Sequence, residues 1–108
     1  MAFSAISLTD ATLTTIAAAK TGYKVRLYSY LVKGDAATTV SWSSNSTVLG
    51  AVIVGAAGDG ATAPPTPYGP VERVAWLETA VSEALKIQQS GTVNVKGHCE
   101  YEYVPAVN

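Results

Sequence analysis

His98 is the only histidine of this 108-residue chain, and Glu100 and Glu102 follow it at alternate positions. Residues two apart on a β-strand point to the same face, so the imidazole and the two carboxylates would form one row. Such a row could bind a metal ion weakly or transfer a proton. A complete metal site needs a full coordination shell, which this row does not supply. We therefore interpret the row as a polar face in water or between subunits, and predict no metal site.

Cys99 is the only cysteine, which excludes an internal disulfide and a cysteine-based zinc site. It falls on the opposite strand face from His98, so we predict a small buried side chain rather than a reactive thiol. The Asp59-Gly60 stretch lacks the lysine and hydroxyl residue of a phosphate-binding loop. The sequence therefore predicts no catalytic residues, no cofactor and no enzyme.

Only 14% of the residues are charged, against roughly 25% in a typical soluble domain. This low charge favours a protein whose surface is covered by neighbours, since interface cores are depleted of charge. A β-domain with serine and threonine on its outer face is the alternative. The net charge is −1 and the basic residues are scattered, so neither nucleic acid nor a membrane is an expected partner. We find no signal-peptide pattern and expect synthesis in a cytoplasm.

The segment Thr92–Tyr103 alternates strictly between two faces, which is the period of a β-strand with one packed face. The face expected to point inward carries Val93, Val95, Cys99 and Tyr101. Further strands are expected at Tyr23–Val32, with Val25, Leu27 and Leu31 on one face, at Thr38–Ser44, with Val40 and Trp42 inward, and at Val48–Val54.

The stretch Val71–Gln89 is ambiguous, because its apolar residues recur at helical spacing and its composition favours a helix. Read as strands, Arg73–Thr79 and Ala84–Gln89 each alternate. We predict strands, because the neighbouring strands need partners to complete two sheets. The fold class predicted is all-β: an antiparallel two-sheet β-sandwich of the jelly-roll type.

Gly55–Pro70 holds four of the five prolines and four of the nine glycines, so we predict a long loop that is neither helix nor central strand. Tyr68 is a large side chain in this loop of small residues. It could anchor a partner or cover one end of the sandwich, and both interpretations stay open.

Residues 1–20 are expected to form an N-terminal arm or edge strand, and residues 21–108 the sandwich domain. The arm has too few large side chains for a core of its own, so removing Met1 to Ala18 is expected to leave a folded core and weaken contacts with partners. The candidate partner contacts are its large apolar residues together with the loop tyrosine: Phe3, Leu8, Leu13, Ile16 and Tyr68.

From Thr39 onward the order of features resembles a known family. Trp42 lies in a serine- and threonine-rich strand, followed by Leu49-Gly50, the loop ending in Pro67-Tyr68, and Trp76-Leu77-Glu78-Thr79; Ser82 to Ile87 and Val95 to Tyr101 complete the series. This order is similar to the jelly-roll capsid decoration (cement) proteins of tailed bacteriophages. The resemblance implies a homotrimer on the outside of an icosahedral head, bound to the major capsid protein at the virion surface.

A carbohydrate- or receptor-binding sandwich of a phage tail or fibre is the second hypothesis. Trp42, Trp76 and the six tyrosines could stack on sugars. The strand alternation instead directs several of these rings inward.

Overall fold

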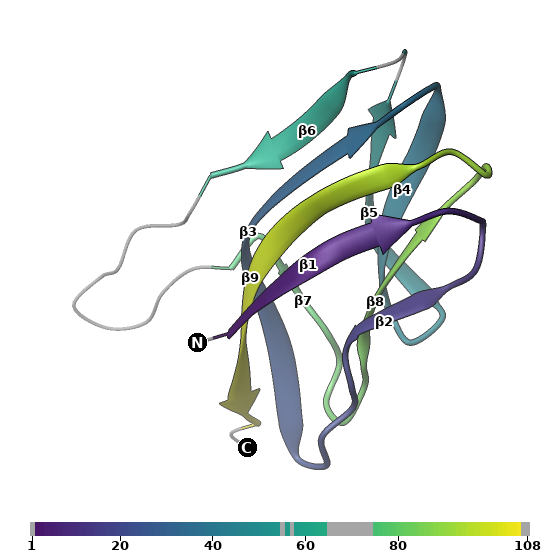
Figure 1. Ribbon diagram of the computed structural model, residues 1–108. Coiled ribbons are helices and arrows are strands. Elements are labelled where there is room, and N and C mark those ends of the chain that lie inside the picture. The colour runs from purple at the N-terminus through teal and green to yellow at the C-terminus, as the bar shows by residue number, and fades with distance from the viewer. Residues whose placement is uncertain (1, 55, 57, 65–74, 107–108) are drawn as a thin grey trace.

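The computed structural model describes residues 2–54, 56, 58–64 and 75–106. Within these residues the chain forms nine strands and no helix, and the strands make two antiparallel sheets that pack face to face (Figure 1). The predicted antiparallel two-sheet sandwich is confirmed.

The first sheet, sheet A, has the strand order β1-β9-β3-β6, with the short β7 also paired to β3. Its strands are β1 (Ala2–Leu8), β3 (Tyr23–Gly34), β6 (Gly60–Ala63), β7 (Leu77–Glu78) and β9 (Val95–Pro105). The second sheet, sheet B, has the order β2-β8-β4-β5. Its strands are β2 (Thr14–Ala17), β4 (Thr38–Ser44), β5 (Thr47–Val54) and β8 (Leu85–Gln89).

The strand pairs are nested along the chain. The pair β4–β5 lies inside β3–β6, which lies inside β2–β8, which lies inside β1–β9. Successive pairs alternate between the two sheets, so the chain resembles one long hairpin rolled into two layers. In addition, β3 pairs with β9 and β4 pairs with β8. These two pairs form the centre of the first and the second sheet, respectively.

The core lies between the sheets and is built mainly from alternate residues of the strands. Val95 and Cys99 are completely buried, and Val93 and Tyr101 pack against the core, so the inward face expected for the last strand is confirmed. The two sheets also meet through Tyr30 of β3 and Trp42 of β4, whose ring centroids lie 5.5 Å apart. The inward positions of Val40 and Trp42 are confirmed as well.

Strand β3 departs from simple alternation. Leu27 pairs with Tyr101 and Ser29 with Glu100, so Tyr28 is an extra residue in a β-bulge. Val25 and Leu27 face the core before the bulge, whereas Tyr30 and Val32 face it afterwards. The sequence-based face assignment is therefore wrong beyond Leu27, because the inserted residue shifts the alternation by one.

The ambiguous stretch contains strands β7 and β8 rather than a helix, as predicted, although residues 71–74 lie outside the described part. Tertiary hydrogen bonds explain why the strand form prevails over helix propensity. The Trp76 amide donates to the Leu27 carbonyl at 2.8 Å, and the Thr79 amide donates to the Val25 carbonyl at 2.9 Å. Ser82 then has a φ of 63°, in the left-handed region, where the chain turns toward β8.

The expected long loop contains a short edge strand, β6, which pairs with Tyr30 to Lys33 of β3. The prediction of a continuous loop was wrong here, because Gly60 to Ala63 carry small side chains and no proline, and β3 offers them a free edge. Gly60 approaches the Val32 carbonyl so closely that a Cβ atom would overlap it. Tyr68 lies outside the described residues.

The N-terminal segment supplies an edge strand to each sheet, β1 to sheet A and β2 to sheet B. Ile6, Leu8 and Ala17 are 2–3% exposed and belong to the core cluster. The segment is thus integrated into the sandwich at both edges. This burial argues against the expectation that the rest of the domain folds normally without it.

Candidate interaction surface

The free edge of β1 is the most distinctive surface of the described residues. β1 reads AFSAISL, without a charge or a proline, and pairs with β9 in unbroken register from Ala2 to Leu8. Ile6 and Leu8 point into the core, while Phe3, Ala5 and Ser7 are exposed on the outer face of sheet A. The Phe3 side chain is 75% exposed, the most among the described large apolar residues. We call the outward residues and free backbone of Ala2–Leu8 the β1 edge.

The other edge strands differ from β1. β2 and β6 have four residues each, and β2 shifts register between Thr15 and Ala17. β5 has eight residues, but its pairing with β4 is interrupted between Trp42 and Ser43. Short strands and bulges are the devices that keep sheet edges from pairing with other chains. Among the described edges, β1 alone combines length, unbroken register and absence of charge.

The outer face of β9 beside this edge carries the row of polar residues noticed in the sequence. His98 is exposed and lies next to Ala5, whereas Glu100 lies next to Phe3 and is only 7% exposed. Glu100 also has an interaction partner within the chain. The row therefore does not lie wholly in water, and the other interpretation, a polar face between subunits, stays a prediction. On the neighbouring strand β3, the extra residue Tyr28 falls between the partners of Tyr101 and Glu100.

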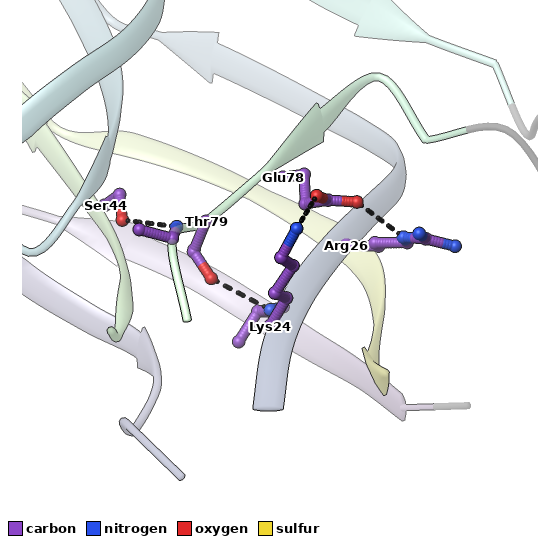
Figure 2. Close-up of polar contacts among 7 residues, drawn as sticks. Lys24, Arg26, Ser44, Glu78 and Thr79 are labelled. Atoms are coloured by element: carbon purple, nitrogen blue, oxygen red, sulfur yellow. Dashed lines mark hydrogen bonds and ion pairs between the residues drawn. The ribbon is translucent and has the colours of Figure 1, made fainter. Parts of the chain in front are cut away.

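An ion-pair cluster lies further along the same sheet and fastens β7 to β3 (Figure 2). Glu78 accepts hydrogen bonds from the Lys24 Nζ at 3.0 Å and the Arg26 Nε at 2.6 Å. Partial burial acts to raise the pKa of Glu78, but these bonds outweigh burial and hold the pKa below its usual value.

The segment that follows Glu78 connects the two sheets. The Thr79 hydroxyl accepts a hydrogen bond from the Val25 amide, and the Ser44 hydroxyl of sheet B accepts one from the Ala80 amide (Figure 2). Ser44 in turn donates to Glu83 at 2.6 Å. These partners satisfy the polar groups of a segment that crosses between the layers, so we assign the cluster a structural role.

A group of tyrosines lies on β3 and β9, and its members interact with each other. Tyr23 and Tyr101 each stack edge-on against Tyr103, at centroid distances of 6.5 Å and 6.1 Å. The Lys20 ammonium lies 4.0 Å from the Tyr23 ring centroid, and the Tyr103 hydroxyl donates to the Ala18 carbonyl. The ring and hydroxyl groups available to a ligand are thus partly occupied by the chain itself.

Sheet B carries a shallow cavity of about 280 Å³ on its surface, where neutral polar side chains predominate. Its lining comes from the β1–β2 connection, β4 and the end of β8: Ala11, Thr39, Ser41, Gln88, Gln89 and Ser90. Gln88 spans one side of it by donating to the Ala11 carbonyl at 2.7 Å. No aromatic side chain lines this cavity.

The candidate partner contacts predicted from sequence differ in how exposed they are in the structure. Phe3 is exposed on the β1 edge, and Leu13 and Ile16 are partly exposed. Leu8 is buried in the chain's own core, so its contacts are internal. Tyr68 lies outside the described part. The residues that sequence reasoning missed are Ala5 and Ser7, and the signal was their alternation with Ile6 and Leu8.

Cys99 carries the one thiol of the chain, and its side chain is completely buried in the core. Burial raises the pKa of its thiol to about 11, which keeps it protonated and unreactive at neutral pH. Among the described residues no group of three or more histidine, cysteine or acidic side chains is placed to hold a metal ion. Nor do these residues include a helix that is long and apolar enough to cross a membrane.

Comparisons with protein-family models, with curated proteins and with solved structures find no match to this chain.

Proposed function

We propose that this chain is a decoration protein of a bacteriophage capsid. In this proposal it is a jelly roll that binds the major capsid protein as a homotrimer at the outside of the head, stabilises the shell, and has neither enzymatic activity nor a cofactor. The nested strand pairing supports the jelly-roll assignment, because it is the pattern of a rolled-up hairpin. The resemblance of the strand order after Thr39 supports the virion assignment.

The observation that carries the binding role is the β1 edge. A seven-residue uncharged strand with an unpaired edge and a 75% exposed phenylalanine is unusual on a protein that works alone. Binding to the assembled shell alone would stabilise that state by mass action, and a trimer would multiply weak contacts through avidity. Low surface charge suits faces that are covered after assembly.

The cavity on sheet B favours a second candidate, a carbohydrate- or receptor-binding module. Its hydroxyl and amide groups match a neutral hydroxylated ligand in polarity. Sugar stacking is less well supported, because Trp42 is 1% exposed and the tyrosine rings partly cover one another. Trp76 is 49% exposed, but its indole donates to the Pro64 carbonyl.

The test uses expanded heads and unassembled shell subunits of the virus that encodes the chain. We expect the purified chain to have the mass of a trimer by light scattering at concentrations well below a micromolar, to sediment with expanded heads only, and to raise the temperature at which they break open. Phe3→Lys should weaken head binding at least tenfold, whereas Ser46→Lys, which adds the same charge at an exposed turn, should not. Failure to bind heads, together with binding on a glycan array, would favour the second candidate.

A further inference from the structure

The β1 edge has a shape and charge that fit a second copy of itself. β1 pairs with β9 on one side only, so the backbone amides and carbonyls directed to the other side have no partner strand among the described residues. An extended chain placed there would pair with them and add a strand to sheet A. What identifies the occupant is how the side chains of β1 match under a two-fold rotation.

A two-fold axis through Ala5 pairs all seven residues of β1 with their counterparts in an antiparallel arrangement. Ala5 then lies opposite Ala5, and Phe3 of each copy lies opposite Ser7 of the other. The phenyl ring of each copy would cover the small residues Ala5 and Ser7 of its partner, which are exposed on the outer face beside it. The large exposed side chain thus meets the small ones, as interface packing requires.

The side chains of β1 also favour the antiparallel orientation. Parallel pairing in register would place Phe3 level with Phe3 and Ser7 level with Ser7, so neither ring would cover small residues of the other copy. β1 carries no charge, so two copies can approach without like-charge repulsion between the paired strands.

We propose that two copies of this chain pair antiparallel through their β1 edges, with Ala5 at the two-fold axis, and join their A sheets into one continuous sheet. The contact is isologous, because each copy contributes the same surface. It does not depend on the proposed function, and it concerns a different contact from a three-fold one. On a head the two-fold contact links one trimer to the next, so the β1 edge strengthens head binding through this link and not through a direct contact with the shell.

Single cysteine substitutions test the register with the purified chain. Directly opposite residues of antiparallel strands have Cβ atoms about 4.5–5.5 Å apart, close to the span of a disulfide. Ala5→Cys should therefore form a covalent dimer, of twice the 11.2 kDa chain mass, under mild oxidation. Ser7→Cys is the matched control, because its two copies would lie four residues apart, about 13 Å along the strand. The natural Cys99 is buried and should stay reduced.

A mixed experiment provides an independent check. Phe3→Cys and Ser7→Cys chains, one of them enlarged by a tag, should crosslink to each other and not to themselves. We expect Ala5→Cys to crosslink at least tenfold faster than Ser7→Cys at micromolar concentration. Equal rates within about twofold, or crosslinks in the mixture that show no preference, would overturn the proposal. Crosslinking of Ala5→Cys only to the shell subunit on heads would also overturn it, and would assign the edge to the capsid.

Discussion

Val95→Asp is the most direct test of how the core is assigned. Val95 is completely buried at the start of β9, between Leu8 of β1 and Gly34 of β3. Losing the burial of the valine side chain costs about 2 kcal/mol. A carboxyl group in an apolar core can have its pKa raised by roughly 3–5 units, so at pH 7 the folded variant keeps the proton that the unfolded chain has lost. At 1.36 kcal/mol per pH unit above the unfolded pKa of about 3.9, this costs about 4 kcal/mol at pH 7. The total of about 6 kcal/mol is comparable to the whole stability of a domain, about 5–15 kcal/mol.

The penalty should depend on pH in a defined direction. Because the carboxyl pKa of the folded variant would lie above the unfolded value of about 3.9, the folded state binds the proton more tightly. The destabilisation should therefore be smallest near pH 4 and grow as pH rises toward the folded-state pKa. Above that pKa it should be constant.

The assay is urea denaturation followed by circular dichroism at pH 4 and pH 7, with two controls. Val95→Ala should cost about 1.5–3 kcal/mol at both pH values. Lys96→Asp, at the exposed next position, should change stability by less than about 0.5 kcal/mol. If Val95→Asp unfolds at pH 7 at the same urea concentration as Lys96→Asp, Val95 does not face the core and the reasoning is refuted.

Three further outcomes are expected. Gly97→Ala should lower stability by several kcal/mol in urea denaturation, because a Cβ atom would overlap the Leu31 carbonyl, whereas Gly91→Ala should be nearly neutral; equal midpoints would contradict this. Glu78→Gln should cost about 1 kcal/mol or less at pH 7, since the Glu78 side chain is 35% exposed to solvent. That difference should vanish as pH falls through the lowered Glu78 pKa, and a cost that persists at pH 2 would show that it does not come from the charge. Deleting Met1 to Ala18 should lower the melting temperature sharply or prevent folding, because it removes three core side chains, and a normal melt would show that the edge strands are dispensable.

The sequence predicted those strands whose pattern is local. Val95 and Cys99 alternate with polar residues, as do Leu85 and Ile87 of β8, and all four are completely buried. The bulge at Tyr28 could not be predicted, because it depends on how β3 aligns with β9. The strand β6 also depends on its partner, since its own sequence has little β propensity.

The candidate surface was only partly predictable. The lack of charge around Phe3 indicated a surface that meets another chain, and the structure places this residue on an exposed edge. Leu8 was grouped with it because both are large and apolar, yet Leu8 shares a strand face with Ile6 and points into the core. That β1 is an edge strand at all follows from pairing with β9, which lies far along the chain and leaves no local signal.

The pairing of β1 with β9 also governs the order in which the molecule can be completed during synthesis. Leu8 leaves the ribosome long before its partner Val95, and the intervening segment takes roughly 4 to 17 s to synthesise. During that interval Ile6 and Leu8 have no finished sheet to cover them, and both edges of β1 are unpaired. A nascent chain of this topology therefore exposes its most association-prone strand for seconds, so chaperone binding or a low rate of initiation should raise the yield of folded protein.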